Sequence, residues 1–145
     1  MNDKTKSGFE DRHARLIKLF NSYKDAKKEN SVKAKEIFKD FADCLERHMR
    51  WEEKVLFPIL RKDKNTAHDS LIDLIRTEHI KILAYLKDLQ EKIDKNLALE
   101  KEEERLILYL IQHEELEDEV IHPTIIKLIK NKEVKEDIFD SIDDI

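Results

Sequence analysis

The chain carries the stretch HMRWEEKVLFP at residues 48–58 and a copy of it, HEELEDEVIHP, at residues 113–123. In register, the two copies repeat a histidine followed four residues later by an acid: His48 with Glu52, and His113 with Glu117. Residues four apart lie one turn above each other on the same face of an α-helix. Each copy is therefore predicted to be a helix that points a histidine and a carboxylate at one spot.

The repeat extends upstream of these two stretches. His13 lies 35 residues before His48, and His79 lies 34 residues before His113. This spacing predicts two similar helical hairpins, each with one histidine on its first helix and a histidine–glutamate pair on its second. Histidines and carboxylates that converge in the core of a helical bundle are typical of a two-metal site. The candidate metal ligands are His13, His48, Glu52, His79, His113 and Glu117.

The composition favours long helices in one domain, and residues 1–145 are taken as a single unit. One glycine, two prolines and 42% charged residues leave little material for turns. A net charge of −5 gives no support for nucleic-acid binding. No apolar run approaches the ~18 residues of a membrane-spanning helix. Because the lone Cys44 also fits a reducing compartment, a cytoplasmic protein is expected.

Apolar residues recur at steps of three and four in four segments, which predicts amphipathic helices. These stripes span residues 9–23, 34–59, 72–93 and 99–121. Short connections between long helices make neighbours antiparallel, so the prediction is an all-α, up-down-up-down four-helix bundle over about residues 9–130. Residues 131–145 are spaced for a short amphipathic C-terminal helix, and this tail is a candidate contact for a homo-oligomer.

Several residues are expected to end or begin the helices. Asn30 or Ser31 is predicted to cap the second helix, and Thr66 or Asp69 the third. Pro58 should kink or end the second helix near Phe57, because proline lacks an N–H donor and clashes with the preceding turn. A further break is predicted near residues 95–96.

All six candidate ligands fall on the buried stripes, where a helix normally carries leucine or isoleucine. Burying an ionised carboxylate without a partner is unfavourable by several kcal/mol. A divalent or trivalent cation supplies the charge that Glu52 and Glu117 need and uses neutral imidazoles as donors. Histidine with carboxylate, and no pair of thiolates, favours iron or manganese over a structural zinc site of the cysteine type.

At these residues the chain resembles the hemerythrin-like family, the four-helix bundles called HHE cation-binding domains. The resemblance rests on His13, the run at 48–58, the Glu78–His79 pair and the run at 113–123. It implies two non-haem iron ions, oxo- or hydroxo-bridged when oxidised. By resemblance, His13 and His48 would hold one iron, His79 and His113 would hold the other, and Glu52 and Glu117 would bridge them.

The chain departs from the oxygen-carrying hemerythrins at two places. Those proteins have two histidines four apart on the third helix, whereas Ile75 and Leu83 flank His79 here. They also place the second bridging acid five residues after the histidine, which would make Asp118 the bridge, although the repeat favours Glu117. One histidine fewer leaves room for an exogenous ligand and favours sensing or redox chemistry over oxygen storage.

The leading functional hypothesis is a module that binds or senses dioxygen, nitric oxide or peroxide at a di-iron site. The alternative is a di-iron oxidoreductase that acts on peroxide, oxygen or nitric oxide, or in the repair of iron centres. A third hypothesis is a metal-stabilised interaction module. His68, in an expected loop, and His122 are predicted not to be ligands. Glu53 and Asp118 are expected beside the site or in solvent, and Cys44 as a small buried residue.

Overall fold

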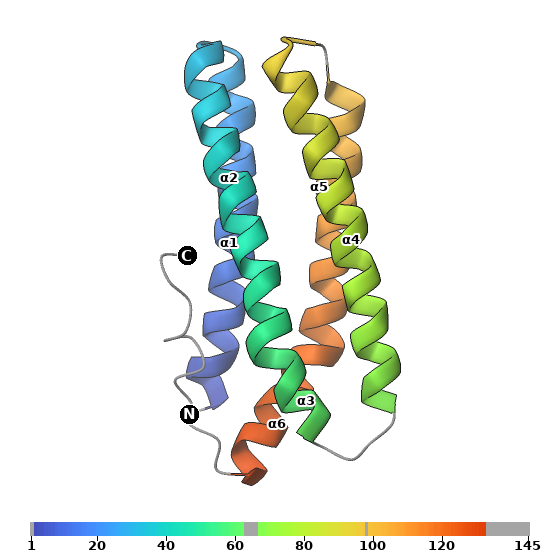
Figure 1. Cartoon of the computed structure of the whole chain (residues 1–145). Helices are drawn as coiled ribbons and strands as arrows, with labels where there is room; N and C mark the ends of the chain where they lie inside the picture. Colours follow the sequence, from blue (N-terminus) through green and yellow to red (C-terminus); the bar gives the residue numbers. More distant parts are fainter. Residues whose placement is uncertain (1, 63–66, 98, 133–145) are drawn as a thin grey trace.

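A computed structural model of the chain describes residues 2–62, 67–97 and 99–132. It contains four long antiparallel helices arranged as two hairpins (Figure 1). The first hairpin consists of α1 (Asn2–Lys27) and α2 (Ser31–Trp51), and the second of α4 (Ala67–Asp94) and α5 (Glu100–Leu116). Within the described ranges there is no strand, so the predicted all-α four-helix bundle is confirmed.

The two hairpin connections lie at the same end of the bundle (Figure 1). At the first, the Asn30 side chain accepts hydrogen bonds from the backbone N–H groups of Val32 and Lys33, which makes Asn30 the cap of α2. At the second, Asn96 takes a positive φ of 58°, and the Leu97 N–H donates to the Lys92 carbonyl at 3.1 Å. This left-handed ending satisfies carbonyls at the end of α4 and produces the predicted break near residues 95–96.

Each repeated stretch contains a π-helical turn that begins at its glutamate. Helix α2 continues through η1 (Glu52–Leu56) into α3 (Phe57–Lys62), and α5 continues through η2 (Glu117–Ile121) into α6 (His122–Lys132). The Phe57 N–H donates to the carbonyl of Glu52, five residues back. Pro58 was expected to kink or end the second helix near Phe57. The predicted end is wrong, because the wider turn accommodates the proline and the chain stays helical.

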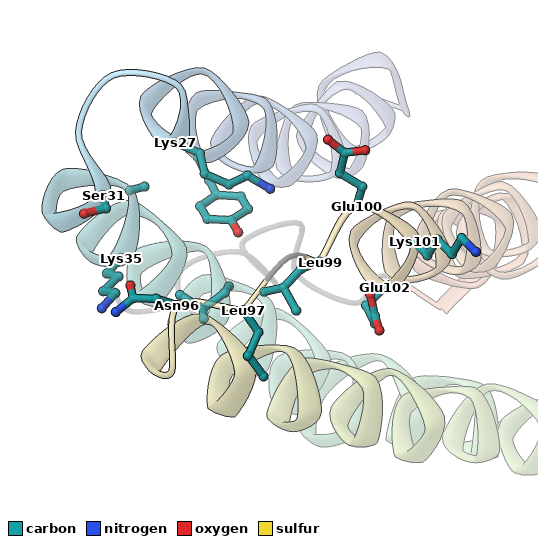
Figure 2. Close-up of a pocket in the computed structure, with 12 residues that line it drawn as sticks. Lys27, Ser31, Lys35, Asn96, Leu97, Leu99, Glu100, Lys101 and Glu102 are labelled. Carbon is teal, nitrogen blue, oxygen red and sulfur yellow. The ribbon is translucent and has the colours of Figure 1, made fainter.

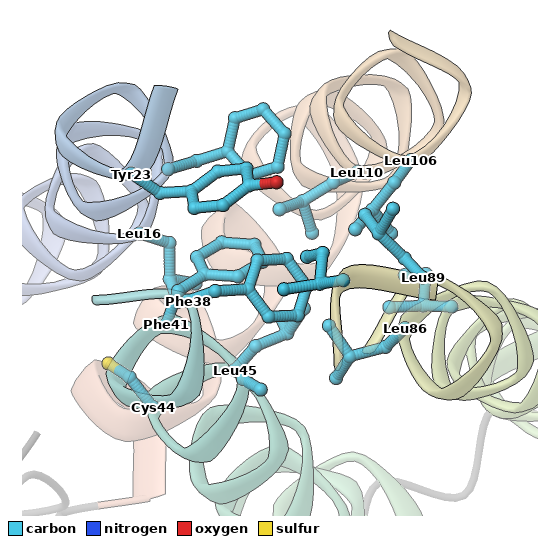
Figure 3. Packing of buried hydrophobic residues seen from close by; sticks show 14 of the residues in the cluster. Leu16, Tyr23, Phe38, Phe41, Cys44, Leu45, Leu86, Leu89, Leu106 and Leu110 are labelled. Atoms are coloured by element: carbon cyan, nitrogen blue, oxygen red, sulfur yellow. The ribbon is translucent and has the colours of Figure 1, made fainter. Parts of the chain in front are cut away.

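Two apolar clusters fill the interior of the bundle. The connection-end core contains Leu16, Phe41, Leu45, Leu86 and Leu110, among others, and Figure 3 shows their side chains meeting between the helices. Cys44 is buried in this cluster, as expected for a small core residue. The α3–α6 core lies at the other end and includes Phe9, Leu56, Leu60, Ile75 and Ile125. Both clusters draw on both hairpins, so they hold the hairpins together.

A few local predictions have other outcomes. Helix α4 begins at Ala67, so His68 lies in its first turn and is buried, not in a loop, and Asp69 is inside the helix and not its cap. Thr66 lies outside the described residues, as does the predicted tail from residue 133 onward. None of the helices in the described ranges is both long and apolar enough to cross a membrane.

Candidate metal centre

The six predicted ligands lie in one layer between the two apolar clusters. Each of the four long helices contributes one histidine, and the two glutamates begin η1 and η2. On α1, His13 stands between Phe9 of the α3–α6 core and Leu16 of the connection-end core. On α4, His79 stands in the same way between Ile75 and Ile82. All six side chains are buried, and Glu52 and Glu117 are each only 1% exposed. Apolar residues above and below therefore separate this polar layer from solvent.

The structure brings the six residues together as two overlapping groups. The first group consists of His13, His48, Glu52 and Glu117, and the second of Glu52, His79, His113 and Glu117. Within each group, one ligand atom from every residue lies within 4.8 Å of the others. The two glutamates belong to both groups, whereas each group has its own pair of histidines.

Each glutamate presents one oxygen to each group. Glu117 Oε1 lies 3.2 Å from Nε2 of His13, and its Oε2 lies 3.2 Å from Nε2 of His113. Glu52 Oε1 lies 3.1 Å from Nε2 of His79, and its Oε2 lies 3.6 Å from Nε2 of His48. This is the orientation that a carboxylate needs in order to bridge two metal ions.

Most of the atoms that face one another in this layer lack a hydrogen-bond partner, although Nε2 of His79 lies within hydrogen-bond distance of Oε1 of Glu52, at 3.1 Å. Those without a partner include Nε2 of His13, of His48 and of His113, Oε2 of Glu52 and both oxygens of Glu117. Buried polar atoms in folded proteins are nearly always satisfied, so a cluster of unsatisfied ones needs an explanation. A cation bound among neutral imidazoles and carboxylates satisfies all of them, and the residues present therefore fit a metal.

The opposite ring nitrogens of three histidines face further carboxylates. Nδ1 of His79 lies 2.8 Å from Glu53 Oε2, and Nδ1 of His113 lies 2.7 Å from Glu78 Oε1. Nδ1 of His13 lies 3.3 Å from Asp118 Oδ1. A carboxylate at Nδ1 fixes the tautomer that leaves Nε2 as a metal donor, and it makes that donor more basic.

The electrostatics of the metal-free chain follow from this arrangement. Burial lowers the pKa of His13, but the carboxylates of Asp118 and Glu117 outweigh it and raise that pKa to about 11. The pKa of His79 is raised to about 10, because Glu117 and Glu52 outweigh burial. That of His113 is also raised to about 10, since burial is outweighed mainly by Glu117. These three imidazoles therefore hold protons at neutral pH until a metal displaces them.

The pKa values of the remaining three predicted ligands are shifted in different directions. Burial, together with the charge on His13, lowers the pKa of His48 well below its ordinary value. Burial and the nearby charge of Glu117 raise the pKa of Glu52 to about 8. Burial also acts to raise the pKa of Glu117, but the charge on His113 and further contacts hold it well below the ordinary range. In the metal-free state Glu117 is thus the ionised partner of the histidines, and Glu52 is neutral at pH 7.

Sequence reasoning missed Glu114, a buried acid beside the first group. Glu114 is 6% exposed, its Oε2 has no hydrogen-bond partner, and that oxygen lies 3.9 Å from Nε2 of His13. Burial raises the pKa of Glu114 to about 8. The signal was present in the sequence, because Leu106, Leu110, Glu114 and Glu117 follow one another at helical steps of four, four and three.

His122 and Asp118 form a smaller group with His13 at the edge of the layer. Nδ1 of His122 lies 2.9 Å from Asp118 Oδ1, and the His122 ring stacks on Phe9 with ring centroids 3.9 Å apart. The Asp118 side chain is 41% exposed, in contrast to the enclosed Glu117. Asp118 therefore connects His13 with solvent, while Glu117 occupies the position between the two histidine pairs.

A separate cavity of about 660 Å³ lies at the end of the bundle that holds the hairpin connections (Figure 2). Lys27, Asn96 and Leu99 are among its lining residues, and none of the six predicted ligands lines it. Two lining residues, Tyr23 and Lys27, donate hydrogen bonds to the buried carboxylate of Glu103, with Lys27 Nζ 2.8 Å from each oxygen. This polar network is internally satisfied, so it differs from the unsatisfied layer between the cores.

The chain is similar to a known protein family. The model of the hemerythrin HHE cation binding domain matches residues 7–125, which is most of the chain and includes all six predicted ligands. No curated protein and no solved structure matches the chain significantly.

Proposed function

The chain belongs to the hemerythrin HHE cation-binding domain family, and we propose that it holds two iron ions and binds or senses dioxygen, nitric oxide or peroxide at them. His13 and His48 would serve one iron, His79 and His113 the other, with Glu52 and Glu117 bridging. When bound, ferrous iron supplies the electrons for chemistry on the small ligand, and the protein supplies donors and an enclosed site.

The observation that carries this proposal is the orientation of the two buried glutamates. Each presents one oxygen to a histidine of the first group and the other oxygen to a histidine of the second. A single metal would need only one of these groups. Two shared carboxylates and two separate histidine pairs support two ions about 3.5–4 Å apart, the spacing common to two-metal sites.

The surroundings support an exogenous small ligand over a closed structural site. The second group has two histidines and two shared carboxylates, and the positions one turn before and after His79 hold Ile75 and Leu83. These apolar side chains cannot donate to a metal. Its donor set is therefore smaller than the six positions that iron commonly fills, which leaves room for water or a diatomic molecule.

The other carboxylates of the site have supporting roles in this proposal. Glu53 and Glu78 hold the Nδ1 protons of His79 and His113, so that both rings keep Nε2 toward the metal. Asp118 faces Nδ1 of His13 at a longer distance, 3.3 Å, as an ion-pair partner. Asp118 and Glu53 also reach solvent, with side chains 41% and 36% exposed, so protons released by metal binding can leave through them.

The test is anaerobic loading with ferrous iron followed by exposure to air. The wild-type protein should approach two irons per chain by elemental analysis, and its absorption spectrum should change on contact with air. A change that reverses when oxygen is removed supports binding or sensing, whereas continuing peroxide consumption supports the oxidoreductase alternative. One iron per chain, or zinc binding without iron affinity, would contradict the di-iron proposal.

A matched pair of variants on α4 controls this experiment. His79→Ala should lower the iron content, because it removes a predicted ligand of the second group. His68→Ala removes a buried histidine from the same helix that belongs to neither group, and it should leave the iron content unchanged.

A further inference from the structure

Glu114 differs from every other acid on α5 in combining deep burial with an unsatisfied oxygen that faces a predicted ligand. Its side chain is 93% buried, given a relative exposure of 7%, and Oε2 has no hydrogen-bond partner. The carboxyl of Glu103, on the same helix, is equally enclosed but is held by Tyr23 and Lys27. Burial alone therefore does not explain the position of Glu114, because a structural buried acid in this chain has partners.

The direction of Glu114 points to the first group. Its Oε2 lies 3.9 Å from Nε2 of His13, the nitrogen that also faces Glu117 Oε1 at 3.2 Å. Two donors to one metal ion can be up to about 4.4 Å apart, since each is about 2.0–2.2 Å from the ion, and Glu114 and His13 meet this limit. Glu114 is not itself among the residues of the first group, whose ligand atoms all lie within 4.8 Å of one another. Helix α5 thus offers the first group a second carboxylate besides the shared Glu117.

The carboxylate of Glu114 is present in only one of the two copies of the repeat. In register, the residue after His113 is Glu114 and the residue after His48 is Met49. Met49 is buried in the connection-end core and contributes no oxygen. The two metal positions therefore have the same shared ligands and the same number of histidines, but different numbers of nearby carboxylates.

We propose that Glu114 is a further ligand of the metal held by His13 and His48, so that this ion has one more protein donor than the ion held by His79 and His113. This inference rests on the proposed di-metal function and deepens it. It assigns the exogenous ligand to the second metal, which keeps the more open coordination sphere.

The test removes the Glu114 carboxylate and then supplies another one. Glu114→Ala should weaken ferrous iron binding at one of the two sites by about tenfold or more, measured anaerobically by competition with a chelator. Added acetate should restore most of that affinity, because it fits the space left by the side chain. Glu114→Met, which installs the residue of the other copy, should lose the same affinity without recovery in acetate. Glu115→Ala, an exposed neighbour on α5, should match the wild type.

A second readout follows the exogenous ligand. Oxidised wild-type protein should take up one azide per chain, whereas Glu114→Ala should take up two, because both irons then have an open position. Circular dichroism of the metal-free variants shows whether they are folded, and the conservative Glu114→Gln replaces Glu114→Ala if that variant is not.

The outcomes separate this inference from the proposed function. Wild-type protein with fewer than two irons would contradict the proposed function itself. If the wild type holds two irons and Glu114→Ala binds both with unchanged affinity, only the role of Glu114 is wrong. An affinity loss that acetate does not reverse would also overturn it, since that result indicates a structural role.

Discussion

In the first hairpin Nδ1 of His48 has no hydrogen-bond partner, whereas in the second hairpin Nδ1 of the equivalent His113 lies 2.7 Å from Glu78. The residue before His13 is Arg12, and the residue before His79 is Glu78. The two hairpins therefore repeat the six predicted ligands but not their surroundings. A repeat of this kind specifies where donors converge, and the residues that differ between the copies make the two positions unequal.

The contacts between the hairpins also pair equivalent residues of the two copies, but at different distances. Glu53 of the first copy reaches His79, and its repeat partner Asp118 reaches His13, so each hairpin orients a histidine of the other. The Glu53 contact is 2.8 Å long and the Asp118 contact 3.3 Å. The second group is thus held more firmly by neighbouring carboxylates, while the first has Glu114 beside it.

The largest expected effect comes from the shared glutamates. Glu52→Gln and Glu117→Gln keep the size of the side chain but remove an anionic bridge, so each should reduce the iron content from two per chain to one or fewer. Elemental analysis after anaerobic loading measures this. If either variant keeps two irons, that glutamate is not a bridge.

The same two variants should differ when no metal is present. Glu52 is neutral at pH 7 in the metal-free chain, because burial raises its pKa to about 8, so Glu52→Gln should change the unfolding free energy by less than about 1 kcal/mol. The ionised Glu117 balances the histidines around it, so Glu117→Gln should destabilise the metal-free chain by about 3 kcal/mol. Urea unfolding of the metal-free variants makes the comparison.

The next prediction concerns pH and separates the two groups. In the metal-free chain His79 and His113 both have a pKa of about 10, whereas in the first group only His13 is raised, to about 11, and His48 is lowered. Metal binding must displace the protons held at neutral pH. Between pH 8 and 9, where Glu52 and Glu114, with pKa values of about 8, have mostly lost their own protons, affinity should therefore rise by up to about 100-fold per pH unit at the second group and about tenfold at the first.

Calorimetric titration with Mn²⁺ without oxygen, in two buffers of different ionisation enthalpy, counts the protons that metal binding releases.

The stability of the metal-free chain should fall as pH rises, whereas the metal affinity should increase. A histidine whose folded pKa lies above the unfolded value of about 6.5 stabilises the fold below that pH, and the stabilisation is lost as pH rises toward 10. Two results would contradict this prediction: a metal affinity that does not depend on pH, or a metal-free protein that is more stable at pH 9 than at pH 6.

How much of this arrangement the sequence predicts depends on the range of the interaction. The stripes on each helix follow from steps of three and four within one segment, and they correctly place Phe9, Leu16, Ile75 and Leu110 in the cores. The convergence of six ligands follows from the repeat together with that periodicity. Contacts across hairpins, such as His113 with Glu78 at a separation of 35 residues, depend on how helices rotate against each other. Periodicity on one helix does not determine that rotation.

The π-helical turns show a second limit. Proline at 58 was reason to expect a kink or an end of the second helix, because the local rule concerns the hydrogen bond that proline cannot donate. The structure keeps the chain helical through η1 and η2, where the residue before each proline bonds five residues back to a glutamate carbonyl. Packing of α3 and α6 at the end of the bundle favours this continuation, and such packing is a tertiary effect.

A smaller effect is expected from the repeat partners Glu53 and Asp118. Glu53→Ala should weaken the metal held by His79 and His113 by about tenfold, and Asp118→Ala should weaken the other metal by a similar or smaller factor. Cobalt absorption spectra, compared with those of His48→Ala and His79→Ala, identify which metal is affected. Loss of both metals in Asp118→Ala would instead make Asp118 the bridge in place of Glu117, the alternative that the spacing of oxygen carriers suggests.

The smallest effect is expected when His122 is replaced by phenylalanine, the residue that the other copy carries at the equivalent position, Phe57. The ring of His122 stacks on Phe9, and its Nε2 is buried without a hydrogen-bond partner. His122→Phe keeps an aromatic ring in this place and removes an unsatisfied nitrogen, so thermal stability and iron content should both stay close to wild type. The contact with Asp118 is lost, but Asp118 still faces His13. Elemental analysis and thermal unfolding of the iron-loaded variant test this prediction. If the variant loses one iron, His122 is a ligand, and the group of His13, Asp118 and His122 takes part in metal binding.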